Sequence, residues 1–240
     1  VALVAFAVFW AVESRVREPL VETRFLKRRA TWALLATTFL TMTGVFAVVN
    51  GLVPSLAQNG DAGFGMEPDL ASLVFLTPYA LVGWIVGPFA GRLAPTIGYR
   101  AVLRFGLIGS IVSTVLMALV GVHSLPVLVT ATVLIGITYA GIANIILNGL
   151  GIVLSPESNP GFLPGLNAGA FNLGAGVSFA VLPALQIALG VGGSAGTAGY
   201  SGGMLLGAAI TTVALAISFL IPRPEGAETT SVAPQKETVR

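Results

Sequence analysis

The stretch GRLAPTIGYR, from Gly91 to Arg100, lies between two long apolar runs and holds two arginines in ten residues. Charge is scarce elsewhere, because only 9% of the 240 residues are charged and 55% are hydrophobic. A soluble domain of this length carries about a quarter charged residues. Two cations in a glycine-flanked turn between apolar runs are typical of a short loop that joins two membrane spans.

The apolar runs on either side of this stretch are long enough to cross a membrane. Away from the chain ends, four runs carry no charged side chain: 30–60, 70–91, 105–156 and 158–222. A membrane helix needs about 20 apolar residues, so the last two runs are long enough for two crossings each. Turn-forming stretches interrupt them at Gly121–Pro126 and at Gly190–Gly203. The sequence therefore predicts six spans, near 31–56, 69–90, 101–122, 125–154, 163–189 and 200–221.

The two ends of the chain differ from these spans. The first residues, VALVAFAVFWAV, are apolar from the outset and have neither an initiating Met nor the basic start of a signal peptide. We expect residues 1–14 to be the end of a truncated membrane helix and 15–30 to be a basic cytoplasmic linker. The linker is either a plain loop or a short interfacial helix. The six-helix bundle would cover 31–221, and a disordered polar tail 222–240.

The placement of Lys and Arg predicts the orientation. Of the twelve, six lie in 13–30, three in 91–104 and three in 223–240, whereas the alternate connections have none. Short cytoplasmic loops carry the excess of basic residues. The three basic segments are therefore predicted to face the cytoplasm, in a bacterial-type plasma membrane.

The stretch Gly91–Arg100 resembles the cytoplasmic signature of the major facilitator superfamily. That signature has a glycine, a small residue, an acid, a base, a second glycine and then basic residues, and here it is matched by Gly91, Ala94, Gly98 and Arg100. Pro95 stands in place of the acid, which implies that no charge relay passes through this copy. In the family the loop contacts the opposite half and stabilises one access state, so Arg92 and Arg100 are expected to act as a latch and topology anchor. Arg104 is expected to join them in meeting phosphates or acids of the other half.

Three glycines lead into this loop at four-residue spacing, Gly83, Gly87 and Gly91. Small residues at this spacing let two membrane helices approach closely. We expect helix packing to account for them.

A second resemblance covers residues 13–221. The run from Glu13 through PLVETRFLKRRATWALL looks like the 14-helix drug:proton antiporter branch of the superfamily. The resemblance implies an all-α membrane protein, the C-terminal half of a major facilitator fold with six complete transmembrane helices plus one truncated helix. It also implies proton-coupled export of amphipathic drugs or other small organic compounds by alternating access.

Ionisable residues offer little chemistry. Away from their ends, the predicted spans hold no Asp, Glu, Lys, Arg or His, so the proton-carrying group is expected outside them. His123 lies in an outward turn without the partners of a hydrolase, and no metal-ligand spacing or phosphate loop occurs. We therefore expect neither an enzyme nor a cofactor, and no nucleic-acid partner. The expected partners are a small-molecule substrate, the proton and membrane lipids.

Uncharged polar residues are the remaining candidates for a substrate site. Asn144 and Asn148 are one helical turn apart, and Thr43 and Asn50 are seven residues apart, so each pair is predicted to share a helix face. In the family each half consists of two inverted three-helix repeats, and the first helix of each repeat lines the cavity. Here those helices are 31–56 and 125–154. The alternative is that these side chains only join helices by hydrogen bonds.

Tyr79 and Asn167 are further polar residues of the predicted spans. Tyr79 is expected either to stack on an aromatic substrate or to pack in the core. Asn167, near the cytoplasmic end of its span, is expected to make capping or loop contacts.

Two other functions stay open from the sequence. A membrane-spanning subunit of an ATP-driven permease would present a cytoplasmic helix to an ATPase, and only 13–30 qualifies for that. A non-transporting structural protein would leave the asparagine-bearing spans without a purpose.

Overall fold

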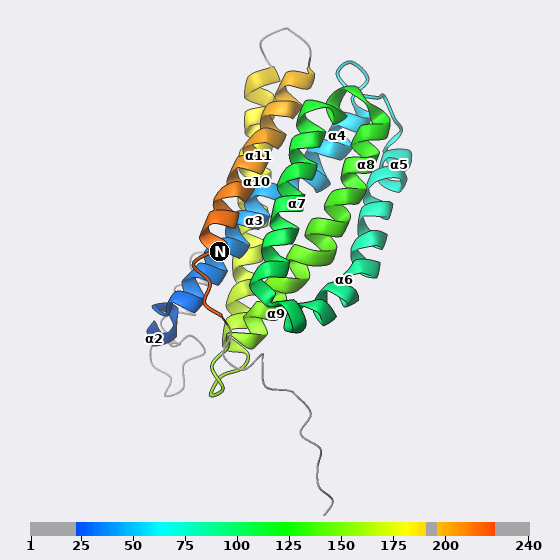
Figure 1. Ribbon diagram of the computed structural model, residues 1–240. Coiled ribbons are helices and arrows are strands. Elements are labelled where there is room, and N and C mark those ends of the chain that lie inside the picture. The colour runs from blue at the N-terminus through cyan, green and yellow to red at the C-terminus, as the bar shows by residue number, and fades with distance from the viewer. Residues whose placement is uncertain (1–22, 191–195, 224–240) are drawn as a thin grey trace, which may run out of the picture.

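The computed structural model describes residues 23–190 and 196–223, which form a single up-and-down helical bundle (Figure 1). In this part of the chain six helices are long and apolar enough to cross a membrane. In chain order the spans are Arg29–Gln58, Pro68–Ile97, Tyr99–His123, Leu125–Val153, Phe162–Gly190 and Thr197–Ser218. This confirms the predicted all-α membrane fold with six spans. The expected truncated helix at 1–14 and nearly all of the expected tail lie outside the described residues.

Several spans are composed of more than one helical segment. A short helix α2 (Thr23–Leu26) precedes the bundle within the predicted linker. The first span joins α3 (Arg29–Ala47), η1 (Val48–Leu52) and α4 (Val53–Gln58). The second joins α5 (Pro68–Ala71), η2 (Ser72–Leu76) and α6 (Thr77–Ile97). The third is α7 (Tyr99–Leu119) with the 3-10 turn η3 (Gly121–His123). The fourth joins α8 (Leu125–Ile135), η4 (Gly136–Ala143) and α9 (Asn144–Val153). The fifth is α10 (Phe162–Gly190) and the sixth is α11 (Thr197–Ser218).

The segments η1, η2 and η4 are π-helical. A π-helix bonds each N–H to the carbonyl five residues back, so it holds more residues per turn and rotates the side chains that follow. Such segments are frequent at functional sites. The first span has η1 in its second half, and the fourth span has η4 near its middle.

The spans pack in a pattern that repeats within the chain. The first span packs against the fifth and sixth, the fourth packs against the second and third, and the third and sixth pack together. Exchanging the first three spans for the last three reproduces the same set of pairs. This is the pattern expected of two three-helix repeats, and it makes the first and fourth spans equivalent.

Small residues allow the closest of these contacts. In α3, a Cβ on Gly44 would lie 2.5 Å from the Gly207 carbonyl oxygen of α11. In η4, a Cβ on Gly136 would lie 2.8 Å from the Tyr79 carbonyl oxygen of α6. Of the glycine ladder, Gly83 faces Ala140 closely enough that a Cβ would lie 2.7 Å from its methyl carbon. Close helix packing therefore explains this member of the ladder, as the spacing predicts.

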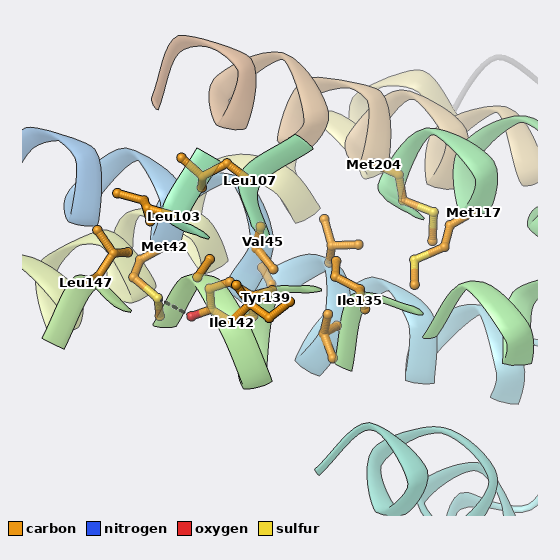
Figure 2. Packing of buried hydrophobic residues seen from close by; sticks show 14 of the residues in the cluster. Met42, Val45, Leu103, Leu107, Met117, Ile135, Tyr139, Ile142, Leu147 and Met204 are labelled. Carbon is orange, nitrogen blue, oxygen red and sulfur yellow. Dashed lines mark hydrogen bonds between the residues drawn. The ribbon is translucent and has the colours of Figure 1, made fainter. Parts of the chain in front are cut away.

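A buried core fills the space between the first, third, fourth and sixth spans. Figure 2 shows Met42 and Val45 of α3 beside Leu103 and Leu107 of α7 and Tyr139 of η4. The Tyr139 hydroxyl donates a hydrogen bond to the Met42 sulfur, so the one polar atom of this buried ring is satisfied. The core fixes the first and fourth spans against each other.

The stretch Gly91–Arg100 is not the loop that the sequence predicted. Helix α6 continues to Ile97 and α7 begins at Tyr99, so Gly98 alone joins them. Gly98 has φ +96°, which favours glycine because a side chain would be strained there. The helix continues because Ala94 is fully buried against the bundle, and Pro95 lies within the helix without ending it.

Candidate functional site

A buried asparagine joins three spans near the end of the bundle that holds the basic residues. Asn167 of α10 is 1% exposed, and its carbonyl oxygen accepts a 2.6 Å hydrogen bond from the Thr38 hydroxyl of α3. Its amide nitrogen donates to the Leu147 carbonyl at 3.4 Å and to the Asn148 side-chain oxygen at 3.5 Å. Asn167 therefore links the first, fourth and fifth spans, rather than making the capping or loop contacts that we expected.

Asn144 and Asn148 extend these hydrogen bonds toward the surface of the bundle. The Asn148 amide nitrogen donates to the Asn144 backbone oxygen at 2.8 Å and to its side-chain oxygen at 3.2 Å. Asn148 is exposed and Asn144 is half-buried. The two side chains lie on one face, as their spacing predicts. Asn148 joins the fourth span to the fifth through Asn167, and the expected substrate contacts of both asparagines stay a prediction.

Thr43 and Asn50 differ in burial and in hydrogen-bond partners. Thr43 is 4% exposed, and its hydroxyl donates to the Phe39 carbonyl at 2.8 Å and to the Gly174 carbonyl of α10 at 3.4 Å. Asn50 is exposed, and its amide nitrogen donates to the Phe46 carbonyl at 3.0 Å. Asn50 lies within the π-helical turn η1, so the seven-residue spacing of a regular α-helix does not hold up to it. The common face of Thr43 and Asn50, and their expected role in substrate binding, stay predictions.

Three phenylalanines lie between Asn50 and the asparagines of the fourth span. The Phe46 ring meets Phe171 of α10 with centroids 6.2 Å apart, and Phe179 of α10 with centroids 5.7 Å apart. Phe171 lies one helical turn after Asn167, and Phe46 lies one turn before Asn50. We call the continuous set of six the amide–aromatic strip: Asn144, Asn148, Asn167, Phe171, Phe46 and Asn50.

The strip has a definite chemistry. Its members are uncharged, so it offers hydrogen bonds from amides at both ends and aromatic faces between them. Aromatic rings stack on planar ring systems, and a few placed polar groups fix the orientation of a ligand. The sequence indicated only the asparagines. The sequence analysis missed the phenylalanines, although Phe46 and Phe171 each lie four residues from an asparagine on the same helix, which is a signal that the sequence does contain.

Tyr79 lies apart from the strip. It is half-buried on α6, where its backbone lies against Gly136 of the fourth span. Its expected role, either stacking on a substrate or packing, remains a prediction.

The arginines gather at the end of the sixth span. Arg29 donates to the Leu220 carbonyl at 2.9 Å, and Arg100 donates to the Ile221 carbonyl at 3.1 Å. The Arg104 guanidinium lies 3.9 Å from the centroid of the Phe219 ring. Cations stabilise the carboxyl end of a helix because the last carbonyls carry partial negative charge.

These contacts change the reading of the loop signature. Arg100 bonds within this bundle, at the Ile221 carbonyl. The resemblance implied a contact with the other half, and that contact stays a prediction. Arg92 is exposed, and no hydrogen bond to another described residue is formed by its side chain. Its expected latch role therefore stays a prediction.

Known proteins resemble this chain over most of its length. Residues 1–179 match the model of the Major Facilitator Superfamily. The chain is also 53% identical, over 224 residues, to the uridine/deoxyuridine transporter of Lactococcus lactis subsp. cremoris (strain MG1363). The match covers 92% of this chain and 46% of that relative, so the chain spans about half the length of the curated relative. On these grounds, and with its six membrane-spanning helices, the chain belongs to the major facilitator superfamily of transport proteins.

Proposed function

We propose that the full-length protein carries a uridine-type nucleoside across the cell membrane by alternating access. The observation that carries this proposal is the 53% identity to a uridine/deoxyuridine transporter over 92% of the chain. Export of amphipathic drugs, which the sequence resemblance implied, has no such support from the relative. A nucleoside is a small organic compound, although it is more polar than the amphipathic compounds first expected.

The amide–aromatic strip has the chemistry that a nucleoside requires. A pyrimidine base is a planar ring with carbonyl acceptors and a ring N–H donor, and the sugar adds hydroxyl groups. Phe46 and Phe171 would stack on the base, while Asn50 and the asparagines of the fourth span would bond its edges and the sugar. Because the strip has no cationic side chain, a phosphorylated nucleotide would find no partner for its charge.

Proton coupling is part of the proposal and would depend on a residue outside the strip. A proton carrier in a membrane is normally an acidic or histidine side chain within a span. In the described spans, Asp69 in the first turn of the second span and His123 at the end of the third are the only such groups. We therefore assign the coupling carboxylate to a part of the full-length protein outside residues 29–218.

Uptake of radiolabelled uridine tests the substrate. Cells without their own uridine uptake, expressing the full-length protein, should accumulate uridine, and a protonophore should abolish this accumulation. Unlabelled deoxyuridine should compete with the label, and uridine monophosphate should not. Absence of uridine uptake together with protonophore-sensitive extrusion of an amphipathic dye would instead establish drug export.

A further inference from the structure

The orientation of each amide in the strip follows from its neighbours. A backbone carbonyl oxygen only accepts hydrogen bonds, so the side-chain atom that bonds to it must be an amide nitrogen. Asn148 has such a contact with the Asn144 backbone oxygen at 2.8 Å, and Asn167 has one with the Leu147 oxygen at 3.4 Å. These two backbone contacts fix which end of each amide is nitrogen and which is oxygen.

The remaining contacts then run in a single direction. The Thr38 hydroxyl donates to the Asn167 oxygen, the Asn167 nitrogen donates to the Asn148 oxygen, and the Asn148 nitrogen donates to the Asn144 oxygen. Every donor points from the buried first span toward the surface of the fourth. Hydrogen bonds in a chain of this kind polarise and strengthen one another in a medium of low dielectric constant.

This chain of hydrogen bonds ends at the amide nitrogen of Asn144. The Asn144 oxygen already accepts from Asn148, and within residues 23–190 and 196–223 its nitrogen meets no acceptor. Asn144 is half-buried, and its amide nitrogen is the one donor of this hydrogen-bond chain that is left for a ligand. A ligand that brings an acceptor to this place would gain a hydrogen bond from an amide whose orientation is already set.

We infer that this hydrogen-bond chain orients the Asn144 amide as a dedicated donor to a carbonyl oxygen of the substrate's base. Asn148, Asn167 and Thr38 are then positioning residues, since they act through Asn144 and need not touch the substrate. The inference rests on the proposed function and deepens it, because it assigns the recognition of a base carbonyl to one atom. A base with an amino group in place of this carbonyl would bring an N–H donor against the Asn144 N–H donor, and it would be rejected.

Thiocarbonyl analogues test the inference because sulfur is a weak acceptor. In the full-length transporter, 2-thiouridine or 4-thiouridine should compete for uridine uptake about tenfold less well than uridine, about the value of one hydrogen bond. In Asn144→Leu, which keeps the shape of the side chain without its polar atoms, uridine should bind about tenfold more weakly. The thio analogue should bind as before, so the difference between the two compounds should disappear.

The positioning residues give a graded series. Asn167→Ala should reduce the difference in competition between uridine and its thio analogue. Thr38→Val should reduce that difference less, since the Leu147 carbonyl still holds the Asn167 amide. A purely structural role would lower the amount of transporter without changing the ratio of the two competition constants. Thr130→Val is the matched control, because Thr130 is an exposed polar residue of the same span that bonds only to the Pro126 carbonyl. Its ratio should equal that of the unaltered protein.

The outcomes separate this inference from the proposed function. If uridine is carried but the ratio is the same in Asn144→Leu and in the unaltered protein, the donor assignment is wrong and the function stands. If the Asn144→Leu protein is absent from the membrane, Asn144→Ser, which keeps a small donor, should show a reduced ratio. If a well-expressed Asn144→Ser protein has the same ratio of competition constants for uridine and its thio analogue as the unaltered protein, the inference is also contradicted. No uridine uptake by the unaltered protein would overturn both proposals.

Discussion

The first and fourth spans occupy equivalent places in the bundle, yet their polar groups are organised differently. Each packs against two spans of the other repeat, and each contains a π-helical segment. Asn50 of the first span is exposed and bonds only to its own helix, at the Phe46 carbonyl. The asparagines of the fourth span belong to a hydrogen-bond chain that reaches two other spans.

This difference separates two kinds of ligand contact. An amide that is hydrogen-bonded through neighbouring residues to other helices keeps one orientation. It suits recognition of one ligand atom, because little side-chain entropy is lost when the ligand binds. An amide anchored only to its own turn presents its free oxygen as an acceptor and can adjust with the helix. We expect the fourth span to select among bases and the first span to contribute affinity.

The largest expected effect comes from breaking close backbone contacts of the first and fourth spans. Gly44→Val would force a side chain against the Gly207 carbonyl, and Gly136→Val would force one against the Tyr79 carbonyl. Neither backbone can yield without separating the helices, so we expect both full-length variants to be lost from the membrane. Fluorescence-detected size-exclusion chromatography measures this.

Gly176→Val is the control for these substitutions. A Cβ at Gly176 of α10 would have no heavy atom of the described residues within 4 Å. This variant should elute as the unaltered protein does. A monodisperse peak for only one of the two other variants would show that the two spans are not equivalent in packing.

A smaller effect is expected when the hydrogen-bond chain alone is cut. Asn167→Ala leaves the buried Thr38 hydroxyl and the Leu147 carbonyl without their partner, which costs about 1–3 kcal/mol in total. The melting temperature of the purified full-length protein should fall. Asn172→Ala, on the same helix, removes an exposed amide that bonds only to the Ala168 carbonyl, and it should leave the melting temperature nearly unchanged. Equal shifts in the two variants would mean that the chain contributes no stability.

The sequence could predict the spans but not the way their polar groups meet. Charge-free runs interrupted by turn residues are enough to place six helices, because the membrane core excludes charge. The asparagine faces depend on finer features. Nothing in the residues around Asn50 indicates a π-helical turn, so the sequence could not show that the α-helical period changes between Thr43 and Asn50. The position of Asn167 depends on which helices pack together, and a single sequence does not contain that information.

The stretch Gly91–Arg100 teaches the same lesson at the surface of the bundle. Glycine, proline and two arginines are a normal loop composition, and their charge correctly marks one end of the bundle. The helix nevertheless continues through Pro95 to Ile97, with Ala94 fully buried. Such burial is a tertiary contact that the loop composition does not reveal.

Asn50 provides a prediction that affects recognition and leaves stability intact. Its amide nitrogen is held by the Phe46 carbonyl, so its oxygen is the group offered to a ligand. Asn50→Leu should weaken uridine competition by about threefold to tenfold, the loss of one exposed hydrogen bond. The ratio between uridine and its thio analogue should not change, since that ratio belongs to the fourth span. A changed ratio in Asn50→Leu would remove the proposed division between the two spans.

The smallest expected effect concerns a charged contact that the first span has and the fourth lacks. Arg29, at the start of the first span, donates to the Leu220 carbonyl, whereas the fourth span starts at the apolar Leu125. The contact is exposed, and a cation near the carboxyl end of a helix contributes about 0.3–1 kcal/mol at low ionic strength. Arg29→Gln should therefore lower the melting temperature slightly in low salt. The loss should shrink at high salt, because exposed charges are screened. Arg92→Gln is the matched control, since the exposed Arg92 side chain bonds to no other described residue, and it should change the melting temperature less than Arg29→Gln does. A loss of the same size at low and high salt would mean that Arg29 stabilises the protein through packing of its aliphatic stem. The start of the first span would then, like the start of the fourth, be held by apolar contacts and not by charge.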